Sequence, residues 1–341
     1  MSSTTLDRPS RLATWRQIVG TCGCSDPKHL DPVGKILLIT RACVQPMTLT
    51  SIAIAGLLAA RSPAFEGWWF ALAAIGSVVA HASNNMINDY FDLTEGLDDA
   101  QYPRAEYAPH PVLSGAISKN GLRQAILASN AIDAVIMVVL AVAQGWPIIA
   151  FALAGLFISV FYVAPPLRLK ARGLGEPSVA LIWGPIMVGG TYYAAVGHLP
   201  GTVLLVSIPY ALLVTTVLMG KHIDKLPWDR AAHIRTLPVL LGDERSRAIT
   251  RLLMAGFYVS IAVLVLTGEL DAWTLVAFAA LPSFSKAART LSRPKPDQPP
   301  RRYPLWPLWY GPWSFVHARN AGALFVVGLA AGALWPVTLR L

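Results

Sequence analysis

The chain has 341 residues, of which 54% are hydrophobic and only 14% are charged, and its mean hydropathy is +0.50. These values exclude an ordinary soluble domain and indicate a protein that crosses a membrane several times. The net charge of +9 does not indicate a nucleic-acid partner, because the basic residues lie in short segments between apolar runs rather than on one face of a soluble domain.

Apolar runs along the chain predict membrane-spanning helices. A bilayer core of about 30 Å requires roughly 20 apolar residues of helix. We predict an all-α polytopic membrane protein in which nine transmembrane helices surround a central cavity. The predicted spans are residues 34–60, 67–88, 121–144, 147–163, 175–197, 201–222, 246–268, 271–289 and 319–339.

The residues before the first predicted span are mostly polar and lack the apolar core and cleavage site of a signal peptide. We interpret residues 1–32 as a cytoplasmic tail and residues 33–341 as one nine-helix membrane domain. The three cysteines form no even disulfide framework and match no zinc-site spacing, so we interpret them as unimportant thiols. They are Cys22, Cys24 and Cys43.

The loops between the predicted spans fall into two sets. One set is short and contains a single basic residue, Arg61, whereas the other is long and rich in lysine and arginine. The positive-inside rule places the basic set in the cytoplasm. We therefore expect a protein of the bacterial plasma membrane whose N-terminus and basic loops are cytoplasmic.

An acidic and amide-rich segment, NNMINDYFDLTEGLDD, follows the second span at residues 84–99. If the helix continues to Asp92, then Asn85, Asn88, Asp89 and Asp92 recur at spacings of three and four and share one face. Carboxylates this close repel one another, so we expect positive charge among them. Solvated loop charges are the simpler alternative for this segment alone. Its further acidic residues are Glu95, Asp98 and Asp99.

A second acidic segment, KHIDKLPWDRAAHIRTLPVLLG, covers residues 221–242 on the same side of the membrane. Carboxylates without histidine or cysteine partners favour a hard cation such as Mg²⁺, which is often shared with substrate phosphates. Asp224 and Asp229 are five residues apart with Pro227 between them, so a regular helix would not place both on one face. We expect a loop or a distorted turn here.

A third segment, FYVAPPLRLKARGLGEPSVALIWGPIMVGGTYYAAVG, covers residues 161–197. Pro165 and Pro166 end the fourth span, and Arg168, Lys170 and Arg172 follow in a short constrained stretch. Taken alone, such a loop can be a topology determinant. With the two acidic segments, it predicts a site where metal ions and basic side chains bind a diphosphate.

Three motifs carry a family resemblance. NDYFDxxxGxD, YxxPPxxLKxRGLGE followed by GPxMVxGTYY, and DRxxxIRTLPVLLG, in this order, resemble the UbiA superfamily of intramembrane prenyltransferases. The similarity is greatest to the 1,4-dihydroxy-2-naphthoate prenyltransferases of menaquinone synthesis. It implies a nine-helix fold and Mg²⁺-dependent transfer of a polyprenyl group to an aromatic, quinone-precursor acceptor. The implied partners are a prenyl diphosphate, a lipophilic or aromatic acceptor and membrane lipids.

The resemblance also implies residue roles. The expected metal ligands are Asn85, Asn88, Asp89, Asp92, Asp224 and Asp229, of which the four aspartates are also the expected catalytic groups. Arg41, Lys170 and Arg172 are expected to bind diphosphate, with Asn85 and Asn88 beside it. Arg41 and Gln45 would lie one turn apart if the first span is one helix. The aromatic candidates for stabilising an allylic cation, or for simple core packing, are Tyr162, Trp183, Tyr192 and Tyr193.

Two other functions remain open on the sequence. A terpene cyclase with this scaffold would let the substrate's own double bonds capture the cation. A lipid transporter or binding protein would retain only the fold, but binding alone does not require two carboxylate clusters. The acceptor, the prenyl chain length and the oligomeric state do not follow from the sequence.

Overall fold

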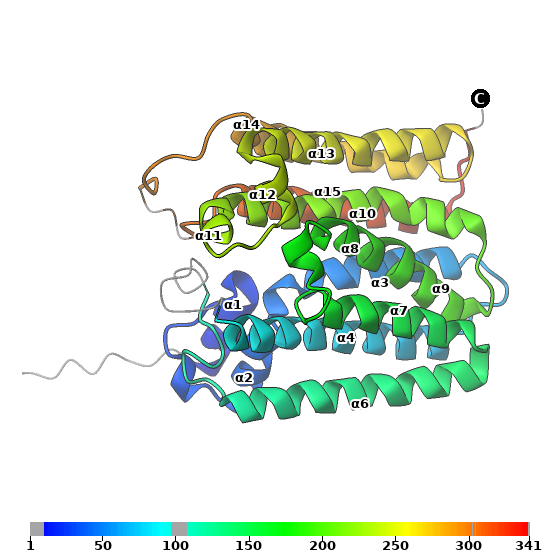
Figure 1. The fold of residues 1–341 in the computed structure, drawn as a ribbon. Helices are drawn as coiled ribbons and strands as arrows, with labels where there is room; N and C mark the ends of the chain where they lie inside the picture. Colours follow the sequence, from blue (N-terminus) through cyan, green and yellow to red (C-terminus); the bar gives the residue numbers. More distant parts are fainter. Residues whose placement is uncertain (1–9, 97–107, 302, 304, 340–341) are drawn as a thin grey trace, which may run out of the picture.

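The computed structural model describes residues 10–96, 108–301, 303 and 305–339, and these residues form helices joined by loops (Figure 1). Asp98 and Asp99 of the first acidic segment lie outside the described residues. The longer helices are α3 (Gln45–Ala59), α4 (Gly67–Thr94), α6 (Lys119–Gln144), α7 (Pro147–Phe161), α10 (Gly201–Asp224), α13 (Asp243–Leu266) and α15 (Tyr310–Leu334). The shorter ones are α1 (Arg11–Thr21), α2 (Pro32–Ile39), α8 (Gly175–Leu181), α9 (Met187–Val196), α11 (Leu226–Ala231), α12 (Leu237–Leu241) and α14 (Leu281–Leu291).

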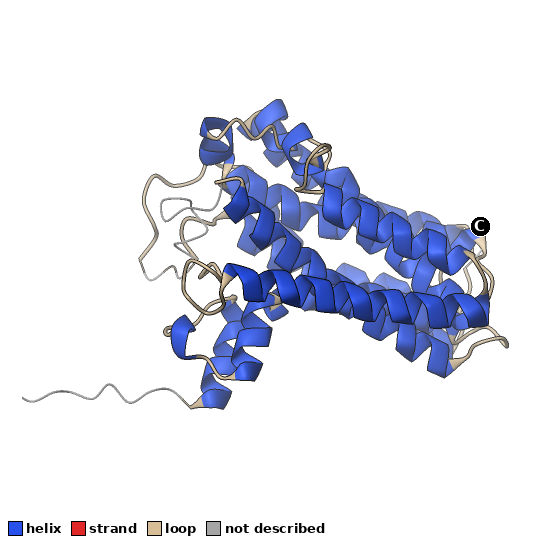
Figure 2. Ribbon diagram, turned by 60° about the horizontal axis from the view of Figure 1, so that its bottom comes forward, coloured by secondary structure: helices blue, strands red, loops and turns tan. Residues whose placement is uncertain are grey.

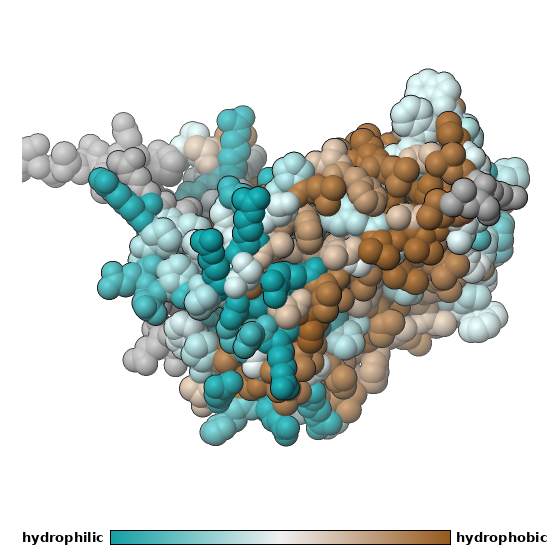
Figure 3. All heavy atoms as spheres, turned by 90° about the horizontal axis from the view of Figure 1, so that it is seen from above, coloured by the Kyte–Doolittle hydropathy of each residue, from teal (hydrophilic) through white to brown (hydrophobic). Residues whose placement is uncertain are grey.

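The long helices run roughly along one direction, and the short helices α1, α2, α11 and α12 gather at one end (Figures 1 and 2). Hydrophilic side chains cover this end on the face drawn in Figure 3, whereas hydrophobic side chains cover much of the rest of that face. On α6, the outward side chains of Val135 and Val142 are 64% and 85% exposed. A long helix with an exposed aliphatic face is suited to lipid rather than water.

Seven described helical stretches are long and apolar enough to cross a membrane, against nine predicted. The two predicted spans that fall short are α7, with 15 residues, and the segment formed by η5 (Ala272–Ala280) and α14. At 1.5 Å per residue α7 is about 22 Å long, less than a bilayer core of about 30 Å. The all-helical, polytopic membrane class is confirmed, and by length alone seven spans rather than nine are found.

The first predicted span is interrupted rather than continuous. α2 ends at Ile39, η2 (Ala42–Val44) follows, and α3 begins at Gln45. Pro46 lacks an N–H and its ring would collide with the carbonyl four residues earlier, so a regular helix cannot run through this point. Arg41 adopts a left-handed conformation with φ of 50°. The expectation that Arg41 and Gln45 are one helical turn apart is therefore wrong.

The cysteine interpretation also differs from the structure. Cys22 and Cys43 form a disulfide with their Cα atoms 5.2 Å apart, and Cys24 is a free thiol. α1 packs against α2 and η2, which brings the C-terminal end of α1 beside Cys43. The pairing results from this packing, which the sequence spacing does not reveal.

The core that positions the remaining elements centres on α10. This helix packs against α13 and α15, and also contacts α8 and η4 (Ile182–Ile186). Leu213, Phe257 and Phe325, from α10, α13 and α15, are completely buried. The end of α10 therefore has a fixed position relative to the start of α15, which matters for the second acidic segment.

Candidate functional site

A cavity of about 580 Å³ lies among α4, α6, α7, α9 and α10. One face of α4 lines it from Ala73 to Asp92. Asparagine, aspartate and lysine side chains gather at the Asp92 end, and mainly apolar side chains line the Ala73 end. The cavity thus has a polar end and an apolar end.

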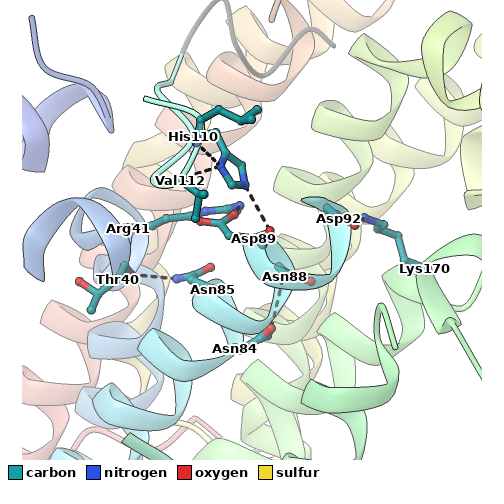
Figure 4. A network of polar contacts seen from close by, with 11 residues as sticks. Thr40, Arg41, Asn84, Asn85, Asn88, Asp89, Asp92, His110, Val112 and Lys170 are labelled. Carbon is teal, nitrogen blue, oxygen red and sulfur yellow. Dashed lines mark hydrogen bonds and ion pairs between the residues drawn. The ribbon is translucent and has the colours of Figure 1, made fainter. Parts of the chain in front are cut away.

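α4 continues to Thr94, past the predicted end of its span, and so carries the first acidic segment as helix. Asn85, Asn88 and Asp92 line the cavity, at the spacings of three and four that place them on one face. Asn84 lines it as well, and its side-chain oxygen accepts a hydrogen bond of 3.2 Å from Asn88 Nδ2 (Figure 4). The sequence pattern therefore predicts this part of the wall well.

Asp89 lies between these residues along the chain but does not line the cavity. Its carboxylate is completely buried and forms an ion pair with Arg41, which does line the cavity (Figure 4). His110 Nε2 lies 3.2 Å from the Asp89 carbonyl oxygen, and Asn85 Nδ2 donates a 3.0 Å hydrogen bond to the Thr40 carbonyl. The ion pair and the Asn85 hydrogen bond hold the irregular segment around Arg41 against α4, and the His110 contact holds the loop around residue 110 against the same helix.

Lys170 provides the second positive charge at the polar end. Its Nζ lies 2.7 and 2.8 Å from the two carboxylate oxygens of Asp92. Lys170 belongs to η3 (Leu169–Arg172), whose backbone is tied to the end of α7 by a 2.9 Å hydrogen bond from Lys170 N to the Tyr162 carbonyl. The expected positive charge among the carboxylates is thus supplied by Arg41 and Lys170.

The other two basic residues of this loop lie elsewhere. Arg168 forms an ion pair with Glu95 in which both side chains are substantially exposed. Arg172 is exposed, does not line the cavity and donates a 3.0 Å hydrogen bond to the Pro166 carbonyl. The sequence spacing of Arg168, Lys170 and Arg172 does not indicate which of them lines the cavity. Their side chains point in different directions because this stretch forms a 3₁₀ turn.

The second acidic segment breaks between its two aspartates, as expected. α10 ends at Asp224, and α11 begins at Leu226 with Pro227 in its first turn. Asp224 Oδ1 accepts a 2.9 Å hydrogen bond from Tyr310 N, and Oδ2 accepts a 2.8 Å hydrogen bond from Gly311 N. Both oxygens of Asp224 thus satisfy backbone donors at the start of α15, where a carboxylate also complements the helix dipole.

Asp224 and Asp229 are 2% and 1% exposed, and neither lines the cavity. Burial, and after it the Asp224 carboxylate, raises the pKa of the Tyr303 phenol to about 12. Asp229 Oδ1 lies 3.9 Å from Nζ of Lys225, which does line the cavity. Asp229 is therefore not part of the cavity wall, but it lies beside a lysine that is.

Two aromatic candidates line the cavity and two do not. Tyr162 and Trp183 contribute to its wall. Tyr192 is buried outside the lining, and the Tyr193 hydroxyl donates a 3.0 Å hydrogen bond to the Gln144 carbonyl. The sequence candidates that the structure brings to one cavity are Arg41, Asn85, Asn88, Asp92, Tyr162, Lys170 and Trp183. Those outside the lining are Asp89, Arg172, Tyr192, Tyr193, Asp224 and Asp229.

Sequence reasoning did not single out the C-terminal end of α10 and the residue that follows it as part of the site. Lys221, His222 and Lys225 all line the cavity. His222 Nδ1 is 2.7 Å from Glu176 Oε1, and the two side chains are 3% and 2% exposed. Lys221 and Lys225 are four residues apart, so the sequence could have indicated that they face the same side of a helix. The contact between His222 and Glu176 joins residues 46 positions apart, which the sequence does not indicate.

Glu176→Ala is expected to lower the free energy of unfolding by about 3 kcal/mol, because it leaves a buried polar ring without its partner. Glu176→Gln retains an oxygen that can accept from Nδ1 and should lose less. Thermal unfolding of the purified variants in one detergent would measure both. Equal unfolding temperatures for wild type and Glu176→Ala would show that the pair contributes no stability.

The polar end fits a magnesium ion. Asn88 Oδ1 is buried and has no hydrogen-bond partner within the described chain, and it shares the cavity wall with the Asp92 carboxylate. Amide and carboxylate oxygens are ligands that Mg²⁺ prefers. The described residues contain no cluster of three histidine, cysteine, aspartate or glutamate side chains that would form a metal cage. An ion that keeps waters and shares substrate phosphates does not need one.

Comparison with known proteins agrees with this architecture. A 1,4-dihydroxy-2-naphthoate octaprenyltransferase of Bacillus subtilis is 25% identical over 212 residues, or 61% of this chain and 66%, just under two thirds, of that protein. A digeranylgeranylglyceryl phosphate synthase of Halobacterium salinarum is 34% identical over 211 residues, covering 60% of this chain and 69% of that protein.

A solved UbiA homolog from Archaeoglobus fulgidus, bound to DMAPP and Mg²⁺, has the same fold, with a TM-score of 0.57 and 20% identity over 86% of this chain and 99% of that chain. The apo UbiA homolog from Aeropyrum pernix K1 gives a TM-score of 0.60 and 19% identity over 83% of this chain and 96% of that chain. The model of the UbiA prenyltransferase family matches residues 49–311, which is well over half of the sequence, and this chain belongs to that family.

Proposed function

We propose that this protein transfers a polyprenyl group from its diphosphate to an aromatic acceptor within the membrane, with Mg²⁺ as cofactor. A single cavity with two unlike ends carries the proposal. Asn88, Asp92, Lys170 and Arg41 line one end, and apolar side chains line the other. A prenyl diphosphate has the same division into a charged head and an apolar tail.

The polar end is suited to a leaving diphosphate. Mg²⁺ held by Asn88 and Asp92, with Asn85 beside them, would neutralise diphosphate charge. Lys170 and Arg41 are held in place by carboxylates, so they can stabilise the diphosphate more strongly as the allylic C–O bond breaks and its charge grows. Lys221 and Lys225, the latter near Asp229, add two further cations on the wall.

The rest of the cavity is suited to the prenyl cation. Its apolar wall keeps water away from the carbon that loses the diphosphate. The faces of Tyr162 and Trp183 would each stabilise a nearby cation by about 0.5–2 kcal/mol. An electron-rich ring carbon of the acceptor then forms the new C–C bond, and the proton that it loses passes to water at the polar end.

For the second acidic segment we propose roles that differ between its two aspartates. Asp224 anchors the start of α15, because both of its oxygens already accept backbone hydrogen bonds. Asp229 directs Lys225 toward the diphosphate. The ligands proposed for Mg²⁺ therefore come chiefly from α4.

The acceptor that we propose is dihydroxynaphthoate or a related quinone precursor. The motif similarity described above and the name of the Bacillus subtilis relative support this choice. We also propose that α7 and the segment Ala272–Leu291 cross the membrane, which gives nine crossings, with the polar end of the cavity in the cytoplasm. Lys170, Lys221 and Lys225 lie at that end, which supports this orientation.

The full-length protein in lipid nanodiscs, incubated with Mg²⁺ and a prenyl diphosphate, tests this function. Dihydroxynaphthoate should yield a prenylated product, and chelation of Mg²⁺ with EDTA should abolish it. Glyceryl phosphate in place of dihydroxynaphthoate tests the other acceptor class. A cyclic hydrocarbon formed without any acceptor would identify a terpene cyclase. Failure to release diphosphate under any of these conditions would contradict prenyl transfer.

A further inference from the structure

A basic hollow on the surface lies beside α14, away from the cavity described above. The sequence from Ala272 to Pro296 contains four basic residues and no acidic residue. Three of the four, Lys286, Arg289 and Arg293, line this hollow together with Trp309. The hollow shares no lining residue with the cavity, so it is a separate feature of the molecule, and we call it the α14 hollow.

Helical periodicity places the basic residues of the α14 hollow on one face. Lys286 and Arg289 are three residues apart in α14, and Arg293 follows four residues later, two residues past the end of the helix. All three are exposed. The other face of α14 packs into the protein, where Ala287 and Leu291 are completely buried. The helix is therefore fixed with its basic face outward.

The C-terminal end of α14 is level with the polar end of the molecule. Leu291 packs in one cluster with Ile223, from the last turn of α10, and Tyr310, the first residue of α15. From Lys286 to Arg293 the chain rises about 10 Å along the helix direction. A bilayer of about 40–45 Å with a core of about 30 Å has a headgroup layer of about 5–8 Å on each side. The three cations thus span the depth of one headgroup layer.

None of these three cations forms an ion pair with a carboxylate of the described residues. Lys286 Nζ lies 4.2 Å from the centroid of the Trp313 ring, a contact that orients the ammonium group without neutralising it. The neighbouring Arg247 differs, because its Nε donates a 2.8 Å hydrogen bond to Asp243. The α14 hollow therefore retains its positive charge and is suited to an anion.

Exposed apolar side chains precede the basic face on the same helical stretch. η5 leads directly into α14, and Leu275, Val276 and Leu281 are 37%, 38% and 40% exposed. Figure 3 shows the side of the molecule on which α13 and α14 lie in Figure 1, and hydrophobic side chains border hydrophilic ones there. Trp309 adds an aromatic ring of the kind common at membrane interfaces. A free anion makes no use of an apolar surface, whereas a phospholipid has acyl chains that cover it.

We propose that the α14 hollow binds the headgroup of an anionic membrane phospholipid, whose acyl chains lie along the exposed apolar residues of η5 and the start of α14. Guanidinium groups donate paired hydrogen bonds to phosphate oxygens, and basic pockets beside membrane helices bind anionic headgroups. A zwitterionic phospholipid carries its own cation beside the phosphate, which the three basic residues repel.

The hollow is also connected to the start of α15. The Tyr310 hydroxyl donates a 2.9 Å hydrogen bond to the Arg293 carbonyl, and Tyr310 N donates to Asp224. A lipid that binds only the folded protein should therefore raise its unfolding temperature.

Titration of the full-length protein in a neutral detergent, followed by native mass spectrometry, tests the proposal. The probes are phosphatidylglycerol, which is anionic, phosphatidylcholine, which is zwitterionic, and inorganic phosphate. Wild type should bind phosphatidylglycerol at least about tenfold more tightly than phosphatidylcholine, since each basic residue near a membrane surface contributes about fivefold. Excess inorganic phosphate should not displace the lipid. The double variant Arg289→Gln/Arg293→Gln should lose at least about tenfold in phosphatidylglycerol affinity.

The matched control is Lys119→Gln/Arg123→Gln, which removes two exposed positive charges from the start of α6, outside the hollow. It should retain the wild-type affinity for phosphatidylglycerol, and the lipid should still raise its unfolding temperature. Without lipid, both variants should unfold at the wild-type temperature, because the changed side chains are exposed. An unchanged affinity in Arg289→Gln/Arg293→Gln, or an equal loss in both double variants, would overturn the site. Displacement of the lipid by inorganic phosphate would identify a site for free anions and would also overturn the proposal.

Discussion

Asp92→Asn is expected to lower kcat by about 10²–10³-fold with little change in unfolding temperature. The carboxylate contacts Lys170 through both oxygens and shares the cavity wall with the Asn88 oxygen. Asparagine has nearly the same shape, but it removes the charge that would hold Mg²⁺ and orient Lys170. Stability changes little because Asp92 and Lys170 are 16% and 11% exposed, so water reaches the lysine when its partner is lost.

The matched control is Glu95→Gln, which removes an acidic charge from the same end of α4. Glu95 pairs with Arg168, and neither side chain lines the cavity. Its variant should retain kcat within about twofold, since exposed ion pairs contribute only about 0–1 kcal/mol. Steady-state turnover at saturating Mg²⁺ and donor would compare the two. Wild-type kcat in Asp92→Asn would remove Asp92 from the site.

Much of the fold follows from local patterns in the sequence. Each of the nine predicted apolar stretches contains helical structure, because apolar runs bounded by glycine, proline and charge favour helices locally. The break at Pro46 was also readable from the sequence, since proline disrupts a helix interior. The length of α7 was not, because the helical conformation there ends at Phe161, before the apolar residues do.

The candidate site was predictable where its residues share one helix. Asn85, Asn88 and Asp92 reach the cavity because helical periodicity sets their direction. The roles of Arg41 and Lys170 depend on contacts with α4 made across 48 and 78 residues of sequence, which spacing rules do not describe. The same limit applies to Asp224. Its partners are backbone donors 86 and 87 residues away, so its acidic motif predicts a metal ligand as readily as a helix anchor.

Asp224→Ala should lower the free energy of unfolding by about 3 kcal/mol, because it leaves two buried backbone N–H groups without acceptors at the start of α15. The two helices approach closely here: a Cβ atom on Gly220 would lie 2.9 Å from Gly311 N. This packing leaves little room for water to replace the lost carboxylate. Thermal unfolding in detergent, monitored by tryptophan fluorescence, would measure the effect.

Comparing Asp229→Asn with Asp224→Ala distinguishes a role in anchoring α15 from a role in catalysis. Asp229 is as buried as Asp224, but it lies near Lys225 on the cavity wall. Asp229→Asn should reduce kcat/KM more than it reduces unfolding temperature, since a misdirected lysine weakens diphosphate binding as charge develops. Asp224→Ala should show the reverse balance. The contrary result for Asp224→Ala is unfolding at the wild-type temperature together with a higher Mg²⁺ concentration required for activity. That result would identify Asp224 as a metal ligand and would contradict its proposed role as the anchor of α15.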